Sequence, residues 1–542
     1  MTHGVFRVPV PTNEPVRSYA PGTPERTSLQ GRLESMSKET PEIPLIIGGE
    51  EVRTGNVVDV VSPHNHRHVI AKAHMGGPEE ARRAIDAAES ARHDWAELPW
   101  EERAAVLLRA ADLLCGPWRD TINAATMLGQ SKTCHQAEID AACEMADFFR
   151  YNAQYATQLY SEQPGSAPGL WNRLEHRPLD GFVLAITPFN FTSIAGNLST
   201  APALLGNTVV WKPSTTALLS NWYLMKMLEA AGMPAGVLNF LPGSGPDIGG
   251  VALPDSRLGG VHFTGSTRTF QHIWKTIGDN VQGYGQYPRL VGETGGKDFV
   301  FVHPSACGAR EVAVALARGA FEYQGQKCSA ASRAYVPKSL WPDVLQELQS
   351  ILSEMKMGDV SDFSNFIGAV IDKNSYTKLK DAIDRAKSEP NVEVVAGGDC
   401  DDSEGYFIQP TVAVVQDPKH DLMRTEFFGP LLGIYVYDDA RIQETLELCA
   451  TTSPYALTGA IFADDRQAVR EATKALRFAA GNFYVNDKPT GAVVGQQPFG
   501  GSRASGTNDK AGSILNLLRW VSPRTIKETF VPPTDWRYPF LD

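Results

Sequence analysis

Residues 182–212 read FVLAITPFNFTSIAGNLSTAPALLGNTVVWK, and this stretch decides the fold. Two short apolar runs, one at each end, flank a segment of helix length. No charged residue occurs at positions 181–211, but Pro188 and Pro202 interrupt the run, which argues against a membrane helix. Strands of a parallel sheet are buried on both faces and are therefore apolar throughout. The stretch is predicted to form a strand, a crossing helix and a second, parallel strand.

The same alternation extends along the chain. Further strands are predicted at 237–241 and 260–264, and a further helix at 216–231. Upstream, the patterns predict strands at 43–49 and 57–61 and amphipathic helices at 79–92, 101–115 and 136–158. A second series of strands and helices runs from about 299 to 505. The fold class is therefore α/β, with a doubly wound sheet of the kind that binds nucleotides and a second α/β domain.

Composition limits the possible functions. The chain has 542 residues, enough for two to four domains, and a formal net charge of -12. That charge argues against a nucleic-acid partner or an anionic membrane and favours small-molecule chemistry. The seven cysteines are scattered and form no CxxC pair, so neither a disulfide framework nor a zinc site is indicated. A reducing compartment fits this cysteine usage.

The remaining segments are interpreted more simply. Residues 1–40 are proline-rich and mix arginines with glutamates, so they are expected to be a tail without a secretory or organellar signal. The run His64-Asn65-His66-Arg67-His68 is interpreted as an exposed turn, because no carboxylate or cysteine ligand lies nearby, and no metal site is predicted. Residues 526–542 are expected to form a strand and an aromatic tail that suits a subunit contact, with a disordered end as the alternative.

One cysteine stands in a distinctive setting. Residues 325–330 read GQKCSA and place Cys328 beside the cation of Lys327 and after Gly325. A neighbouring cation and backbone N–H groups lower the pKa of a thiol, and a glycine lets a substrate approach the backbone. Cys328 is therefore the candidate nucleophile, although an isolated cysteine is more often a small buried apolar residue.

Four stretches share a position directly after a predicted strand: TPFN at 187–190, WKPS at 211–214, FTGS at 263–266 and GETGGK at 292–297. Ligands bind at the carboxyl ends of strands in an α/β sheet. The stretches offer an amide donor, an ammonium, a helix N-terminus and a carboxylate. By contrast, GSGPDIG at 243–249 departs from the dinucleotide fingerprint by one extra residue and a proline, so it is a weak signal.

Together with Cys328 and with EFFGP at 426–430, these motifs resemble the aldehyde dehydrogenase superfamily, in the family's order and over nearly everything after residue 45. The resemblance implies a doubly wound NAD-binding domain, an α/β catalytic domain and a small oligomerisation β-element. The expected boundaries are 1–40 for the tail, 41–165 and 190–297 for the NAD-binding domain, 298–509 for the catalytic domain, and 166–189 and 510–542 for the oligomerisation element.

The resemblance also implies a mechanism. The Cys328 thiolate adds to an aldehyde carbon, and the side-chain amide of Asn190 and the Cys328 N–H hold the oxyanion. After hydride transfer to a nicotinamide, Glu293 acts as the general base that hydrolyses the thioester. Expected cofactor contacts are Thr187, Lys212, Gly265, Ser266, Thr267, Arg268, Thr269, Glu426 and Phe428. Thr215 stands where NAD-preferring relatives often have an acidic residue, so NAD is expected with NADP as a weaker possibility.

Several segments are similar to one branch of the superfamily, the delta-1-pyrroline-5-carboxylate dehydrogenases, which oxidise L-glutamate gamma-semialdehyde to L-glutamate in proline degradation. They are FEY at 321–323, GQKCSA at 325–330, GNFYVNDK at 481–488, TGAVVGQQPFGG at 490–501 and SGTNDK at 505–510. The similarity implies that Gly491 and Ala492 anchor the substrate carboxylate with help from Ser329, while Phe191 and Phe499 flank its methylenes. Glu144 would meet the substrate ammonium or lie on a solvated helix face.

Alternatives remain at this stage. They are another amino- or carboxy-semialdehyde dehydrogenase, a thiol hydrolase that needs no nicotinamide, and a catalytically silent member of the same fold. The expected partners are a small-molecule substrate and further copies of the chain, as a homodimer or a higher homo-oligomer, with no nucleic acid and no membrane. The sequence shows no proline dehydrogenase half, so functional pairing with a separate proline dehydrogenase is possible. A cytoplasmic location is expected, or the mitochondrial matrix in a eukaryote.

Overall fold

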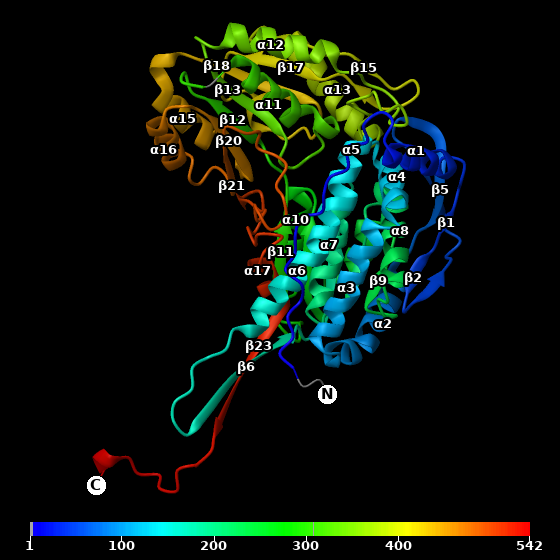
Figure 1. The fold of residues 1–542 in the computed structure, drawn as a ribbon, viewed down its shortest axis with the longest axis vertical. Helices are drawn as coiled ribbons and strands as arrows, with labels where there is room; N and C mark the ends of the chain where they lie inside the picture. Colours follow the sequence, from blue (N-terminus) through cyan, green and yellow to red (C-terminus); the bar gives the residue numbers. More distant parts are fainter. Residues whose placement is uncertain (1–3, 307, 542) are drawn as a thin grey trace.

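The structure is a computed structural model that describes residues 4–306 and 308–541. Two α/β bodies stack on one another, and a long two-stranded arm projects away from both (Figure 1). Within the described part of the chain, no helix has the length and apolar character needed to cross a bilayer. The α/β fold class predicted from the strand and helix patterns is confirmed.

The first body is built on a seven-stranded sheet of order β11-β10-β7-β8-β9-β2-β3. Its strands are β2 (Leu45–Ile47), β3 (Glu50–Val52), β7 (Phe182–Ile186), β8 (Val209–Lys212), β9 (Leu238–Phe240), β10 (Leu258–Thr264) and β11 (Arg289–Glu293). Strands β7 to β11 pair in parallel, and the strand order reverses between β7 and β10. Such a reversal leaves a crevice at the carboxyl ends of the strands, where α/β sheets bind ligands.

Helices cover both faces of this sheet. They are α2 (Pro78–Glu97), α3 (Trp100–Cys115), α4 (Arg119–Gln130), α5 (Cys134–Ala137), the π-helix η1 (Glu138–Glu144), α6 (Met145–Ser161), α7 (Thr192–Leu204), α8 (Leu218–Ala230), α9 (Gly245–Ala252) and α10 (Thr267–Asp279). A three-stranded sheet of β1 (Glu42–Ile43), β4 (Val57–Ser62) and β5 (Asn65–His74) lies beside them. The sequence pattern gave no separate amphipathic stretch for α4, in which the polar residues Arg119, Asn123, Thr126 and Gln130 are buried along with the apolar ones.

The second body has a seven-stranded sheet of order β14-β17-β18-β13-β12-β20-β21. Its strands are β12 (Asp298–Val302), β13 (Ala331–Pro337), β14 (Val392–Ala396), β17 (Thr411–Val415), β18 (Leu431–Tyr437), β20 (Thr458–Phe462) and β21 (Asn482–Val485). The flanking helices are α11 (Ala309–Phe321), α12 (Trp341–Glu354), α13 (Lys373–Ser388), α15 (Ile442–Thr451) and α16 (Arg466–Ala475). Only the edge strand β14 runs antiparallel to its neighbour among the described pairings.

The arm pairs β6 (Leu170–Pro178) with β23 (Val521–Thr529) in antiparallel register from Val521↔Pro178 to Thr529↔Leu170. The strand at the C-terminal end therefore begins five residues before the predicted position 526. Beyond it, Trp536 and Phe540 are each 81% exposed, so this subunit leaves large apolar side chains uncovered. Exposed aromatic residues on a projecting arm are suited to contact another polypeptide.

Three expectations need correction. Residues 1–40 are not a loose tail, because α1 (Pro24–Met36) buries Leu29 and Leu33 and packs against α4. The predicted boundary at 189/190 does not follow the sheet, since β7 lies between β8 and β10 in the first body rather than in the arm. His64 lies in the turn before β5, as expected, but it is buried there, and its ring bonds Ser62 and Ser131.

Gly181, directly before β7, tests how tightly this body is packed. Its φ is +147°, and a Cβ built on it would lie 1.9 Å from the Arg257 carbonyl oxygen. We expect Gly181→Ala to lower the free energy of unfolding by about 2–3 kcal/mol, measured by urea unfolding. In the control Gly278→Ala, the new Cβ meets nothing within 4 Å, so that helix should gain up to about 1 kcal/mol. Equal midpoints for the two variants would contradict this account.

Candidate active site

The four strand-end motifs meet at one edge of the first sheet, as predicted. Thr187 follows β7, Lys212 ends β8, Gly265 follows β10 and Glu293 ends β11. The carboxyl ends of parallel strands share an edge, and the backbone confirms how closely they meet, since the Gly265 N–H donates to the Glu293 carbonyl at 3.2 Å. The second body faces this edge with the segment that carries Cys328.

An unusual backbone turn presents Cys328. Tyr323, Gln324 and Gly325 all have left-handed φ values, from +51° to +66°, directly before the cysteine segment. The Gln324 side chain holds the turn by donating to the carbonyls of Ser131 and Ala369 at 2.9 and 2.7 Å. Left-handed backbone at buried residues other than glycine is costly and persists only where the surroundings impose it. The turn therefore places the cysteine at a defined point between the two bodies.

The sulfur of Cys328 lies 3.5 Å from Oε1 of Glu293, so the thiol donates toward a carboxylate of the opposite sheet. Burial raises the pKa of this thiol well above its usual value, and the charge of Glu293 raises it further. The prediction that Lys327 lowers this pKa is wrong, because the Lys327 ammonium pairs with Glu322 at 3.0 Å. Gly325 was expected to let a substrate approach the backbone. It instead lets the Gly429 backbone approach, because a Cβ on Gly325 would lie 2.4 Å from the Gly429 carbonyl oxygen.

Glu293 has the properties of a base that works near neutral pH. Burial raises the pKa of its carboxyl to about 7, against the opposing hydrogen bond from Cys328 and the nearby charge of Lys510. A carboxylate with a pKa near 7 accepts a proton more readily than an exposed one and is still largely ionised at pH 8. The geometry therefore allows Glu293 to act next to whatever is bound to the sulfur.

Asn190 lies across from the cysteine, in the loop after β7. Its side-chain amide is buried and donates to the Gln326 carbonyl at 3.1 Å, two residues before Cys328. An amide nitrogen carries two N–H donors, and this hydrogen bond accounts for one of them. Fixed donors beside a nucleophile are the arrangement that stabilises an oxyanion.

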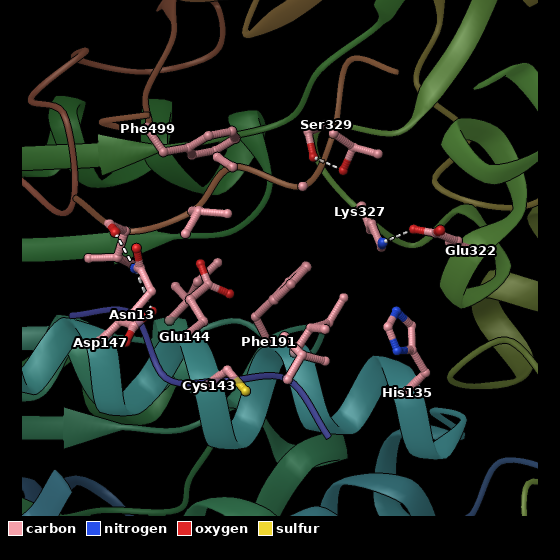
Figure 2. A pocket seen from close by; sticks show the side chains of 18 of the residues that line it. Asn13, His135, Cys143, Glu144, Asp147, Phe191, Glu322, Lys327, Ser329 and Phe499 are labelled. Carbon is pink, nitrogen blue, oxygen red and sulfur yellow. Dashed lines mark hydrogen bonds and ion pairs between the residues drawn. The ribbon is translucent and has the colours of Figure 1, made fainter. Parts of the chain in front are cut away.

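Cys328 lines a cavity of about 340 Å³. Figure 2 shows other side chains of its wall, among them Glu144, Phe191 and Ser329. The cavity brings together all six predicted substrate residues with the nucleophile: Glu144, Phe191, Cys328, Ser329, Gly491, Ala492 and Phe499. Gly491 has a φ of +94°, a conformation that other residues rarely adopt. The Ser329 hydroxyl is hydrogen-bonded to that of Thr490 at 2.7 Å, which ties the cysteine segment to this glycine loop.

Glu144 points into the cavity and not into solvent. It ends the π-helix η1, and its Oε2 accepts a hydrogen bond from the Ser193 hydroxyl at 3.0 Å. Burial raises the pKa of its carboxyl to about 8, and the charge of Asp140 adds to this. The alternative of a solvated helix face is therefore wrong. Single-turn π-helices often mark functional positions.

A buried ion pair behind the cavity wall, which supports Phe191 and the start of α7, was not predicted from the sequence. Lys132 is fully buried, pairs with Asp140 at 2.6 Å and lies 4.1 Å above the ring of Phe191. Asp140 also accepts from the backbone N–H groups of Thr192 and Ser193 at the start of α7. The only sequence signal for this ion pair was the presence of charged residues within an otherwise apolar helical region. That signal does not distinguish a solvated helix face from a buried pair.

The other side of the sulfur suits a dinucleotide. Helix α10 begins at the edge of the sheet with Ser266 as its cap and no acidic residue in its first turn, so its positive end is open to an anion. Arg268 and Thr269 are exposed there, and Thr267 is half-buried. Such a helix N-terminus binds a pyrophosphate. The predicted residues at 265–269 therefore fit the group that they were expected to face.

The remaining predicted cofactor residues lie nearby. Burial lowers the pKa of Lys212 to about 8. Glu426 accepts from the Gly296 N–H at 2.8 Å, which joins the two bodies. Phe428 has a φ of +60° and packs edge-on against Phe189 with 5.8 Å between ring centroids. These ammonium, carboxylate and aromatic groups suit ribose hydroxyls and a flat ring.

The weak fingerprint at 243–249 forms the start of α9, capped by Ser244. A Cβ on Gly243 would lie 2.9 Å from the Gly76 carbonyl oxygen, so this glycine allows two backbones to pack together. The expectation that this region is scaffold agrees with that packing.

A buried thiol, an amide donor and a base at the ligand edge of a dinucleotide-type sheet define an aldehyde dehydrogenase. The aldehyde dehydrogenase family matches residues 51–526, and the chain belongs to this family. It is 52% identical, over 98% of its length and 96% of the relative's, to the mitochondrial delta-1-pyrroline-5-carboxylate dehydrogenase of Dictyostelium discoideum.

Solved structures agree. The delta-pyrroline-5-carboxylate dehydrogenase of Mycobacterium tuberculosis bound with NAD is 56% identical, with a TM-score of 0.96 over 100% of both chains. Proline utilization A from Bdellovibrio bacteriovorus is 28% identical, with a TM-score of 0.91 over 96% of this chain and 53% of that one. The resemblance noted from the motifs, at the level of both family and branch, is confirmed.

The environment of the thiol gives a direct prediction. Replacing Glu293 by glutamine removes a negative charge beside Cys328, so the pKa of the thiol should fall and more thiolate should be present at a given pH. Alkylation of the free enzyme by iodoacetamide at pH 8 should become roughly three- to tenfold faster. Glu404→Gln, at an exposed position, is the control and should leave the rate unchanged. Slower alkylation of the Glu293 variant would show that Glu293 activates the thiol instead.

Proposed function

We propose that this protein oxidises L-glutamate gamma-semialdehyde, the open form of delta-1-pyrroline-5-carboxylate, to L-glutamate with NAD as the hydride acceptor. The observation that carries the proposal is the single cavity that joins Cys328 to the glycine loop at 491–492. Family membership supports the chemistry, and the NAD-bound relative supports the choice of cofactor.

In the proposed reaction, the Cys328 sulfur adds to the aldehyde carbon as a thiolate. The amide of Asn190 and the backbone N–H of Cys328 donate to the oxygen as it becomes negative. Residues at the carboxyl edge of the first sheet would hold NAD, which would supply the hydride acceptor. A thioester on Cys328 then remains, and the Glu293 carboxylate takes a proton from the water that adds to it. Collapse of that adduct releases the acid and regenerates the thiol.

The cavity would position the rest of the substrate. The left-handed backbone at Gly491 allows the consecutive N–H groups of Gly491 and Ala492 to form a nest for the substrate carboxylate. Ala492 has no hydroxyl, so this anchor depends on the backbone and on Ser329. Phe191 and Phe499 would cover the methylenes and exclude water. The Glu144 carboxyl, already inside the cavity, would ionise on meeting the substrate ammonium.

Lys212 and Glu426 would hold the ribose hydroxyls of the cofactor, Thr187 and Phe428 would contact its nicotinamide half, and the N-terminus of α10 would face its pyrophosphate. Preference for NAD over NADP is part of this proposal. The division of the chain into cofactor-binding, catalytic and oligomerisation regions is a proposal as well, with residues 182–189 assigned to the cofactor-binding sheet.

We further propose that the arm of β6 and β23 makes a contact between subunits, because it buries little of its own surface within one chain. Pairing with a separate proline dehydrogenase is proposed from the similarity to proline utilization A, a longer chain. We propose a cytoplasmic location, or the mitochondrial matrix in a eukaryote, where relatives carry a mitochondrial name.

Glu293→Gln tests the order of steps. The amide cannot take a proton from water, so the thioester should accumulate after hydride transfer. Rapid mixing with semialdehyde and NAD should give a burst of about one NADH per active site followed by slow turnover. Cys328→Ala is the matched control and should give no burst while still binding NAD. Full steady-state turnover by the Glu293 variant would contradict the assigned role.

Comparison of substrates tests the proposed identity. Buried donors that meet no carboxylate are costly, so semialdehyde should exceed pentanal in kcat/KM by about 10²-fold or more. Gly491→Val should reduce this ratio and weaken competitive inhibition by L-glutamate, because its φ of +94° disfavours any side chain. Gly165→Val, in open space on the arm side, is the control. Equal use of pentanal by the wild type would overturn the substrate assignment.

A further inference from the structure

The wall of the substrate cavity includes the N-terminal segment. Asn13, Glu14 and Val16 line the cavity together with Asp147 of α6 and Val494 of the glycine loop. In Figure 2 the segment runs along the helix, and Asn13 lies directly beside Asp147. Residues from the start and the end of the chain therefore close the same side of the space that opens on Cys328.

Asn13 uses both ends of its amide to join these elements. Its Nδ2 donates to Oδ2 of Asp147 and to the carbonyl of Val494, each at 2.8 Å. Its Oδ1 accepts from Nε2 of Gln496 at 2.8 Å and from the hydroxyl of Tyr151 at 3.4 Å. One side chain thus ties the glycine loop to α6.

The glycine loop depends on these bonds. Within residues 491–497, the other hydrogen bonds are internal, from Val493, Gln496 and Gln497 to one another. In the part of the chain that the structure describes, both hydrogen bonds that leave this loop end on Asn13. Two of its residues, Gly491 and Gly495, have positive φ, so the backbone has little stiffness of its own.

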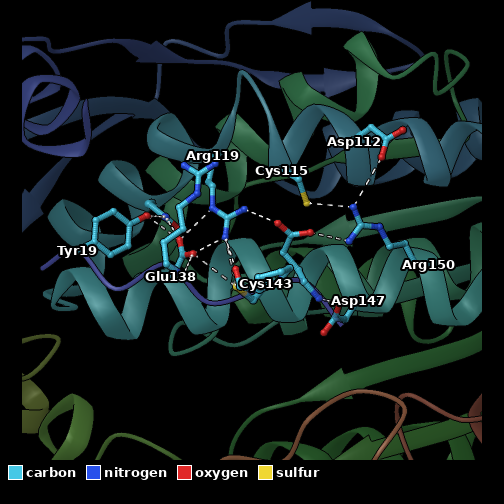
Figure 3. Close-up of polar contacts among 12 residues, drawn as sticks. Tyr19, Asp112, Cys115, Arg119, Glu138, Cys143, Asp147 and Arg150 are labelled. Atoms are coloured by element: carbon cyan, nitrogen blue, oxygen red, sulfur yellow. Dashed lines mark hydrogen bonds and ion pairs between the residues drawn. The ribbon is translucent and has the colours of Figure 1, made fainter. Parts of the chain in front are cut away.

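The N-terminal segment is itself rigidly held (Figure 3). The Glu14 carboxylate bridges Arg119 and Arg150 at 2.6 and 2.8 Å. The backbone N–H of Glu14 donates to the Asp147 carboxylate at 2.8 Å. Burial raises the pKa of Glu14, but the hydrogen bonds from the two arginines outweigh this and lower it to about 2. Farther along, the Tyr19 hydroxyl donates to buried Glu138 at 2.7 Å. Asn13 therefore projects from a fixed support.

We propose that Asn13 is a positioning residue for substrate selection, which holds the 491–497 loop in the conformation where its backbone N–H groups receive the substrate carboxylate. The inference rests on the proposed function and adds a residue to it. Asn13 bonds the loop at Val494, three residues after Gly491 of the carboxylate anchor, and therefore acts on the anchor through the loop. Loss of its two donors should therefore weaken carboxylate binding and leave the chemistry at Cys328 intact.

Asn13→Asp is the sharpest test, because it keeps the shape and replaces the donating nitrogen with an oxygen that faces two acceptors. We expect the KM for L-glutamate gamma-semialdehyde and the Ki for L-glutamate to rise about tenfold. The kcat for pentanal and the alkylation rate of Cys328 should stay within about twofold of the wild type, because neither uses the anchor. Thr12→Val, at the exposed neighbouring position, is the matched control and should change none of these values.

Two further variants separate positioning from stability. Gln496→Ala removes one bond from the exposed side of the loop, should fold normally, and should raise the same KM about two- to threefold. Asn13→Asp combined with Asp147→Asn restores a donor between the segment and α6 but not to Val494. In that double variant the thermal midpoint should recover while the KM stays high.

The outcomes are distinct. Unchanged KM and Ki in folded Asn13→Asp and in Gln496→Ala would overturn the inference, and so would full recovery of the KM in the double variant. Wild-type enzyme that does not prefer the semialdehyde over pentanal would overturn the proposed function, and this inference with it. If the wild type prefers the semialdehyde over pentanal but Asn13→Asp changes neither KM nor Ki, only the inference about Asn13 is overturned.

Discussion

The site depends on the contact between Cys328 and Glu293, which joins two sheets at 3.5 Å. Glu293 ends the last strand of the first sheet, and Cys328 directly precedes a strand of the second. Neither body contains the reactive pair alone, so its geometry depends on how the two bodies pack. The hydrogen bonds from Asn190 to the Gln326 carbonyl and from Gln324 to the Ser131 carbonyl also join the two bodies beside this contact.

Burial controls the acid–base state of this junction. It raises the pKa of Glu293 to about 7 and that of Glu144 to about 8, and it raises the pKa of the Cys328 thiol well above the usual value. The resting thiol is therefore mainly protonated at neutral pH and is protected from adventitious oxidation, because the thiolate is the reactive form. A low dielectric also strengthens the donors around an oxyanion.

The N-terminal segment changes how the cavity is understood. A proline-rich stretch with mixed charges looks like a tail, yet Glu14 satisfies two arginines of the first body and Tyr19 satisfies Glu138. Buried charges are tolerated only when paired, so removing the segment would leave Arg119 and Glu138 without some of their partners. The same contacts bring Asn13 to the cavity wall.

The sequence by itself determined the α/β class, the position of Thr187, Lys212 and Glu293 at the ends of strands, and the identity of the candidate nucleophile. Apolar runs of strand length separated by helix-length segments are local patterns, and motifs at strand ends can be read without coordinates. The family and its branch were also recognisable from short motifs, which carry their residue types in order.

Only the tertiary structure decided the environment of these groups. Lys327 stands next to Cys328 in the sequence but pairs with Glu322, and Asn13 reaches a loop more than 480 positions away. Burial, ion pairing and cavity walls depend on contacts between residues that are distant in the chain, and no local pattern encodes them. For that reason the sequence predicted which residues form the site, while the fold set their pKa values and their partners.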